Sequence, residues 1–308
     1  MAKRQGLIPL RDRVTELEKI YYAVEKEIAR ELSFFNINNY QELRAIRTQE
    51  RIDQLVKMLN RAVIKWAKSS VPEAYKSGYD ISRTRLEILG AKRNEEFPLM
   101  AHRNAIGDYT DKTMNDLIRA NLSIKQNVAT FLYLARRANM GLMQFQAFDL
   151  RDEEIIADLL DEAMAEGETR GTAYRLIRDH FREKFGDAQF IRINNRNYNL
   201  KYYARNVART RLRVVQTRAV KNSCAEFDND LVEISDHGTT CEICIPYEGN
   251  VYSLSGRTPG YPIADDLPPY HNQCEHSCAP TSEEALEWRG KYAEEERRMW
   301  EEWEAESA

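Results

Sequence analysis

The chain has 308 residues, of which 43% are hydrophobic and 31% are charged. This length allows two compact domains, or one domain with long helical additions, and the composition excludes a wholly disordered chain. The sequence has no apolar stretch of signal-peptide length behind its first basic residues, and no apolar run long enough to span a bilayer. We therefore expect a protein that is made and kept in a cytosol, or packaged from one.

The net charge is only −4, but it is unevenly distributed. Residues 170–221 carry 14 Lys and Arg against three acids, whereas residues 222–282 carry one basic residue against ten acids. Residues 283–308 are acidic again, with ten acids and four bases. A basic segment followed by two acidic ones favours intramolecular pairing or polar assembly contacts over a dedicated nucleic-acid domain.

The first half of the chain predicts long amphipathic helices, because apolar residues recur at three- and four-residue spacing. The first stripe is Val14, Leu17, Tyr21, Val24 and Ile28. The second is Leu43, Ile46, Leu55, Leu59, Val63 and Trp66. The third is Met114, Leu117, Asn121, Ile124, Val128, Phe131 and Ala135. We interpret all three as core or helix-packing seams, and expect Pro72 to end the second helix.

The middle of the chain predicts shorter elements. A polar, Gly-containing stretch over 140–152 is a candidate linker, and apolar spacing over 155–164 predicts a short helix ended by Gly167. A further helix is expected over 172–185, followed by a turn-rich break over 194–199.

A basic helix is predicted from about residue 199 to residue 222. One of its faces is small and apolar, and comprises Ala204, Ala208, Leu212, Val215 and Ala219. A second stripe holds Arg205, Arg209 and Arg213. Like charges at this spacing repel one another unless a nearby anion neutralises them. Two interpretations remain open: a solvated face or ion pairs with the acidic module that follows, and contact with an acidic partner or DNA phosphates.

Beyond Phe227 the sequence changes character. Residues 231–234 and 251–254 predict short strands, and Gly and Pro are dense over 246–269. Such a loop-rich module has little core of its own and needs a covalent or metal staple. The last segment, 283–308, predicts an acidic amphipathic helix with Leu286, Tyr292, Met299 and Trp303 near one side.

The strongest chemical signal is a cluster of cysteines and histidines. Cys241 and Cys244 form a C-x2-C pair, and His271 and Cys274 form an H-x2-C pair 27 positions later. Two such pairs offer four ligands to one tetrahedral ion, which suits a structural Zn²⁺. Two more donors lie beside the second pair, so the fourth ligand stays open between His271 and two reserves, His276 and Cys278.

A catalytic centre is not predicted. The chain lacks the H-x-E and P-C-x-x-C pairing of a deaminase, the H-E-x-x-H of a metalloprotease, a phosphate-binding Gly loop and a nucleophile elbow. Asp236 and His237, just before the first pair, are faintly similar to nuclease sites that couple a His base to zinc knuckles. We interpret them as strand-end turn residues, because the acidic surroundings would repel a phosphate backbone.

These residues together resemble a known family. An Ala-Arg-Thr helix at 208–210, the C-x2-C pair, the Glu248-Gly249 turn and the ending His271-x-x-Cys274-x-His276 are similar to the phage minor capsid proteins of the Mu F-like head morphogenesis superfamily. The specific resemblance covers residues 203–280, with weaker similarity from residue 152 onward, and the amino-terminal half matches only in being helical. Arg211, Asn272 and Glu275 depart from the usual Glu, Pro and Arg.

The resemblance implies a non-enzymatic minor head protein of a tailed bacteriophage. Such proteins are present in a few copies per procapsid, associate with the portal, and can leave the head with the genome. The implied partners are the portal protein, the major capsid or scaffold protein, and phage DNA. The implied location is the interior of the virion head, and the host cytoplasm during assembly.

The expected fold is mainly α, with long helices and a small C-terminal zinc-stapled α+β module. We expect a helical domain over 1–150, a helical segment with the basic helix over 151–224, the Cys/His module over 225–282 and the acidic helical tail over 283–308. Two rival functions are a zinc-dependent nuclease or toxin-like enzyme that needs His237 or Asp236, and a DNA-binding packaging accessory that uses residues 170–221.

Overall fold

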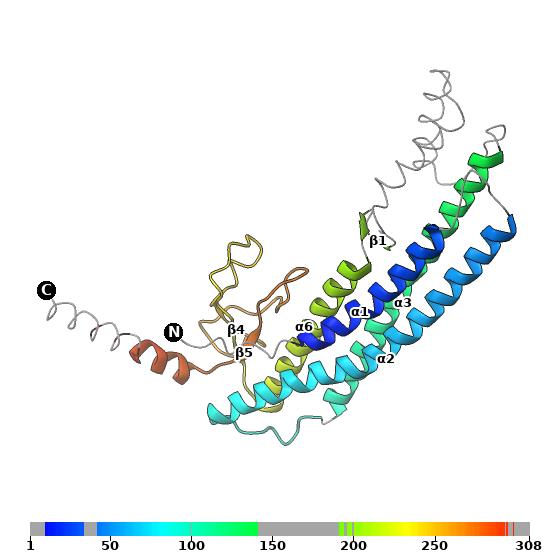
Figure 1. The fold of residues 1–308 in the computed structure, drawn as a ribbon. Coiled ribbons are helices and arrows are strands. Elements are labelled where there is room, and N and C mark those ends of the chain that lie inside the picture. Colours follow the sequence, from blue (N-terminus) through cyan, green and yellow to red (C-terminus); the bar gives the residue numbers. More distant parts are fainter. Residues whose placement is uncertain are drawn as a thin grey trace. The chain divides into compact units, whose positions relative to one another are not determined.

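The computed structural model describes residues 10–33, 42–98, 100–140, 191–193, 196–198 and 200–292, together with residues 294 and 298. These residues are mainly helical, with a small sheet near the C-terminus, which confirms the predicted fold class (Figure 1). Two compact units share the chain. Unit 1 comprises Met1–Arg13, Ala67–Thr113 and Asn206–Ala308, and unit 2 comprises Val14–Trp66 and Met114–Arg205.

The long helices are α1 (Arg11–Ser33), α2 (Glu42–Ile88), α3 (Met100–Met140) and α6 (Leu200–Glu226). The expectation that Pro72 ends the second helix is wrong, since α2 continues through it. A proline removes one backbone hydrogen bond, but its neighbours Val71 and Ala74 are fully buried, and this packing holds the helix together. The linker and helices expected within 141–190 lie outside the described residues.

Unit 2 contains a bundle in which α1 lies beside α2 and α3 (Figure 1). The predicted stripes supply its core, with Leu17, Leu59 and Leu117 almost fully buried. Leu43 and Ile46, expected in the second stripe, are instead 70% and 48% exposed. The buried positions of this first part of α2 are Ala45, Thr48 and Ile52, so the apolar face is rotated from the predicted one.

A buried polar residue on the third stripe is explained by hydrogen bonds between helices. Asn121 is fully buried on α3, where an unpaired amide would be costly. Its Oδ1 accepts a hydrogen bond from the Tyr21 hydroxyl at 2.8 Å, and its Nδ2 donates to Asn60 Oδ1 at 2.8 Å. The amide thus links α1, α2 and α3.

In unit 1, α6 packs against the second half of α2 through small residues. The predicted small face of α6 is confirmed, since Ala208, Val215 and Ala219 are fully buried. The closest approach is at Gly78 of α2, where an added Cβ would lie 2.7 Å from the carbonyl oxygen of Gln216 and 3.0 Å from its Cα. Both atoms belong to the backbone, so neither can move aside without shifting the helix.

We expect Gly78→Ala to destabilise the protein by about 2 kcal/mol, because overpacking against backbone outweighs the helix propensity that alanine adds. The matched control is Gly107→Ala in α3, where a Cβ would meet nothing within 4 Å. That change should stabilise the protein by up to about 1 kcal/mol. Urea unfolding of the two variants measures both effects, and equal shifts of the two midpoints would contradict the close packing.

The C-terminal sheet belongs to unit 1 and has the strand order β4-β3-β5. The strands are β3 (Leu231–Ile234), β4 (Val251–Ser253) and β5 (Cys278–Pro280), and β3 pairs antiparallel with both neighbours. The first two strands were predicted from the sequence and the third was not. β1 (Ile191–Ile193) comes just before the turn-rich break expected over 194–199, and it pairs antiparallel with β2 (Arg196–Tyr198), which lies within that break.

A buried carboxylate holds the loop that follows β4. The Asp230 side chain accepts hydrogen bonds from the Ser253 hydroxyl (2.6 Å), from the backbone N–H and hydroxyl of Ser255 (2.8 and 2.6 Å), and from the backbone N–H and hydroxyl of Thr258 (3.0 and 2.8 Å). Burial alone would raise the pKa of Asp230, but hydrogen bonds from the Ser253, Ser255 and Thr258 side chains outweigh it and hold the pKa well below its ordinary value.

Asp230→Asn is expected to cost about 3 kcal/mol at pH 7, since an amide cannot accept all of these donors and leaves buried groups unpaired. A depressed folded-state pKa stabilises the fold fully above the unfolded value of about 4 and progressively less as the pH falls below it. The difference between the two proteins in urea unfolding should therefore be constant above about pH 4 and shrink in more acidic buffer. A difference that grows with acid would contradict this account.

The tail begins as a helix over residues 283–292 and is tied to the sheet. Ser282 Oγ accepts a hydrogen bond from the backbone N–H of Ala285, and Arg289 binds Glu233 of β3 with both terminal nitrogens. Trp288 and Tyr292 stack on each other and are 67% and 56% exposed. Among the described residues, no helix is both long enough and apolar enough to cross a bilayer.

Candidate metal centre

Two tight turns present the predicted donors. In the first, the backbone N–H of Cys244 donates to the Cys241 carbonyl at 2.9 Å, and that of Tyr247 donates to the Cys244 carbonyl at 2.9 Å. In the second, the N–H of Cys274 donates to the His271 carbonyl at 3.2 Å, with Gln273 at a positive φ of 66°. Each pair of donors therefore projects from a single turn.

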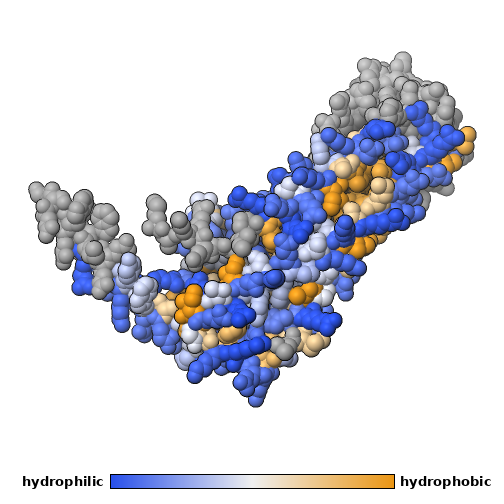
Figure 2. Space-filling model, turned by 60° about the horizontal axis from the view of Figure 1, so that its bottom comes forward, coloured by the Kyte–Doolittle hydropathy of each residue, from blue (hydrophilic) through white to orange (hydrophobic). Residues whose placement is uncertain are grey.

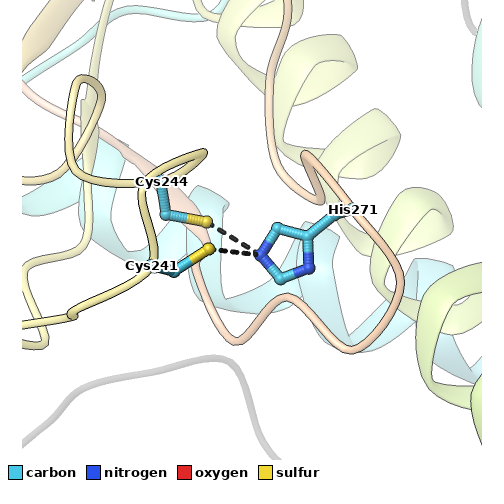
Figure 3. A group of neighbouring side chains, drawn as sticks. All are labelled: Cys241, Cys244 and His271. Atoms are coloured by element: carbon cyan, nitrogen blue, oxygen red, sulfur yellow. Dashed lines mark hydrogen bonds between the residues drawn. The ribbon is translucent and has the colours of Figure 1, made fainter.

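The two turns bring the donor atoms to metal-binding separations. His271 Nε2 lies 3.4 Å from Cys241 Sγ and 3.0 Å from Cys244 Sγ (Figure 3). Cys244 Sγ lies 3.9 Å from Cys274 Sγ, which lies 3.7 Å from His276 Nδ1. Tetrahedral Zn²⁺ at ordinary bond lengths would separate two sulfurs by about 3.8 Å and a sulfur from a nitrogen by about 3.6 Å. The donor set therefore fits a metal ion.

The donors form two groups of three that share one cysteine. Cys241, Cys244 and His271 make one group, and Cys244, Cys274 and His276 make the other, with the ligand atoms of each within 4.8 Å of one another. Cys244 is almost fully buried and Cys241 is partly exposed. These five residues could hold a metal ion, and Cys244 lies at the centre of the arrangement.

Both histidines have the tautomer that metal binding requires. His271 Nδ1 lies 2.7 Å from the Asn272 carbonyl oxygen. A carbonyl only accepts, so Nδ1 carries the proton and the neutral ring keeps its Nε2 lone pair for the metal. His276 Nε2 lies 3.1 Å from a Glu248 carboxylate oxygen, which by the same reasoning leaves Nδ1 free to bind.

Local polarity affects the two cysteines of the first turn in opposite directions. Backbone N–H groups of Cys244 and Ile243 point at the Cys241 sulfur and lower the pKa of its thiol. Burial raises the pKa of Cys244 to about 12, and the neighbouring Cys274 adds to this effect. A bound cation reverses the second effect, because a coordinating thiol is deprotonated by the metal's own charge. Of these two cysteines, Cys244 is therefore the one whose thiolate form depends more on a bound metal ion.

Two contacts hold the turns together without a metal. Tyr247, after the first pair, stacks on Tyr270, before the second, with ring centroids 4.1 Å apart and an interplanar angle of 16°. Glu248 accepts hydrogen bonds from the backbone N–H groups of His237 and Thr239. Sequence reasoning assigned no role to this carboxylate, because only the fold places it against His276.

Two predicted residues belong to neither group of donors. Cys278, a reserve ligand, belongs to neither group of donors; it packs in an apolar cluster with Val220, Cys224 and Ile234. Burial raises the pKa of Cys278 to about 12. His237 lies beside the donors, with Nε2 2.8 Å from Ser235 Oγ and its ring packed edge-on against His276 at 4.9 Å.

The arginine stripe of α6 faces acids within its own unit. In unit 2, Arg205 binds Glu18 of α1 with two nitrogens. In unit 1, Arg209 lies 3.4 Å from Glu275, between the last two donors. Arg213 is partly buried, and this burial lowers its pKa. The geometry favours the internal ion-pair interpretation for Arg205 and Arg209, and contact with a partner or DNA stays a prediction.

Comparison with known proteins gave one match. A family model described as phage minor capsid protein 2 matches residues 15–279, which is most of the chain. The comparison with curated proteins and the comparison with solved structures gave no match.

Proposed function

The chain belongs to the phage minor capsid protein 2 family, and from this premise we propose that it acts in procapsid assembly, bound to the portal. Membership makes it a structural protein of the phage head and places it in the virion. The family match confirms the resemblance to phage minor capsid proteins that we inferred from residues 203–280. It also covers the amino-terminal helices, which had resembled the family only in being helical. Ejection with the genome is a further part of this proposal.

The family match over 15–279 carries the proposal, because it includes the helices of both units as well as the donor module. The surface supports assembly through polar contacts. On the face in Figure 2, hydrophilic residues predominate and hydrophobic residues lie in small separate groups. Ile243 and Ile245 are exposed on either side of Cys244. The donor module therefore presents a small hydrophobic group beside the turn that carries Cys241 and Cys244.

We further propose that the metal is a structural Zn²⁺ held by Cys241, Cys244, His271 and Cys274, with His276 in reserve. The supporting observation is the donor chemistry: soft sulfurs and imidazole nitrogens that form two groups of three around the shared Cys244. The ion would supply cross-linking, since four protein ligands leave no open position for a substrate. Metal binding energy would thereby become folding energy for a module with little core.

Cross-linking of purified procapsids tests the portal assignment. We expect cross-links between this protein and the portal, and procapsids from a phage lacking the gene should contain portal but package or eject DNA poorly. Cross-links to the major capsid shell alone would contradict the proposal. After infection with labelled particles, recovery of the protein inside cells supports ejection, and its retention in empty heads rejects it.

The enzymatic alternative rests on the position of His237 against His276. Metal-dependent cleavage of DNA or RNA by the purified protein, abolished by His237→Ala, would establish a nuclease and overturn the structural assignment. Steeply salt-dependent DNA binding that weakens when the stripe of Arg205, Arg209 and Arg213 is neutralised would favour the packaging accessory. We expect neither result.

A further inference from the structure

We propose that the metal centre has a spare ligand: His276, held ready by Glu248, takes the fourth position when His271 is lost. This inference rests on the proposed metal site. It follows from five donors that form two groups of three around the shared Cys244, with each histidine hydrogen-bonded through the ring nitrogen that does not face the sulfurs. The two histidines lie in different groups around the shared Cys244, with His271 beside Cys241 and His276 beside Cys274, so each can bind an ion that Cys244 holds.

His271 and His276 differ in their surroundings. The His271 ring lies near the surface, and its proton is held only by the carbonyl of the adjacent Asn272. His276 is 3% exposed, and its proton is held by a carboxylate 28 positions away in the sequence. Exposure makes His271 the more easily displaced of the two. Burial and a long-range contact keep His276 in one orientation.

Glu248 is a positioning residue for His276. Its side chain accepts hydrogen bonds from the backbone N–H groups of His237 and Thr239, which hold it in place. One oxygen accepts from the His237 N–H and from His276 Nε2, and the other accepts from the Thr239 N–H at 2.9 Å. These contacts fix the carboxylate, and the carboxylate fixes the ring so that Nδ1 faces Cys274. Carboxylate partners of this kind orient histidine ligands and raise their basicity.

The two histidines should leave different signatures when the full-length protein, stripped of metal, is titrated with Co²⁺. A Co²⁺-bound histidine gives one exchangeable, hyperfine-shifted ring N–H signal in the NMR spectrum. We expect His276→Ala to keep this signal with Co²⁺ affinity close to that of the wild type, and His271→Ala to keep one such signal and 1:1 binding with Co²⁺ affinity reduced about tenfold. The double variant should lose the signal, and its affinity should fall by at least about 100-fold. In His271→Ala the signal comes from His276 Nε2–H, which Glu248 shields from exchange with water.

Glu248 is tested in the His271→Ala background. Adding Glu248→Ala should lower Co²⁺ affinity a further tenfold to about 100-fold, and Glu248→Gln should recover part of this, because its carbonyl can still accept from His276. The matched control is Glu287→Ala, an exposed acid of the tail helix, which should change nothing. Circular dichroism checks that each variant keeps its helices.

Three outcomes would overturn the inference. His271→Ala could lose the signal as completely as the double variant, His276→Ala alone could abolish it, or Glu248→Ala could match the Glu287→Ala control. Failure of the wild-type protein to bind Co²⁺ at all would instead reject the proposed metal site, so the two failures are distinguishable.

Discussion

Cys244→Ser, or removal of the metal with a chelator, is expected to unfold residues 227–282 and leave the helices of unit 2 folded. Cys244 belongs to both groups of donors, so its loss disrupts the site whichever histidine is bound. Structural Zn²⁺ contributes on the order of 10 kcal/mol to small metal-dependent modules. The apolar cluster here, built around Val220, Val232 and Ile234, is too small to replace that contribution.

Hydrogen exchange localises this effect. Amides of β3, β4 and β5 should exchange rapidly after the change, whereas those of α1 and the first half of α2 should keep their protection. The matched control is Cys278→Ala, a cysteine outside both groups, which should retain one metal ion per chain. Wild-type protein purified without stoichiometric metal, with a melting temperature that a chelator leaves unchanged, would contradict the prediction.

Glu226→Ala is expected to destabilise unit 1 by about 3 kcal/mol, since it removes one partner of a buried ion-pair network. The Glu226 side chain is 2% exposed, and its two oxygens bind Arg93 Nε at 2.9 Å and His102 Nε2 at 3.1 Å. His102 Nδ1 accepts from the Tyr75 hydroxyl at 2.8 Å, and that hydroxyl accepts from Asn222 at 2.6 Å. The network therefore joins the end of α6 to α2 and to the start of α3.

Loss of the carboxylate leaves His102 Nε2 and Arg93 without their shared partner. Tyr75 is only 2% exposed, and this burial raises its pKa to about 12. The matched control is Glu87→Ala, which breaks an exposed pair with Arg83 on α2 and should cost less than about 0.5 kcal/mol. Urea unfolding followed by tyrosine fluorescence measures both changes. Equal costs would mean that the buried network contributes no more than a surface pair.

Local sequence patterns were enough to predict most helices and two of the three C-terminal strands. Residues 200–226 form one helix because their small apolar face repeats at helical spacing over its whole length, a signal that does not depend on distant contacts. The prediction that Pro72 ends the second helix was wrong because it used only the local rule that proline interrupts a helix. In the structure, burial of Val71 and Ala74 keeps α2 intact through Pro72. β5 was missed because three residues carry no periodicity, and only pairing with β3 defines them.

The sequence by itself determined the chemistry of this protein: a C-x2-C and an H-x2-C pair in a core-poor, acidic module, and helices whose apolar stripes require partners. Ligand spacing and helical periodicity are local properties, so they can be read without a fold. Only the tertiary structure decided that Gly78 must admit the backbone of Gln216, that Glu226 closes a buried network, and that Glu248 aims His276 at Cys274. Each joins residues distant in sequence, and such contacts depend on how the helices pack and where the loops return.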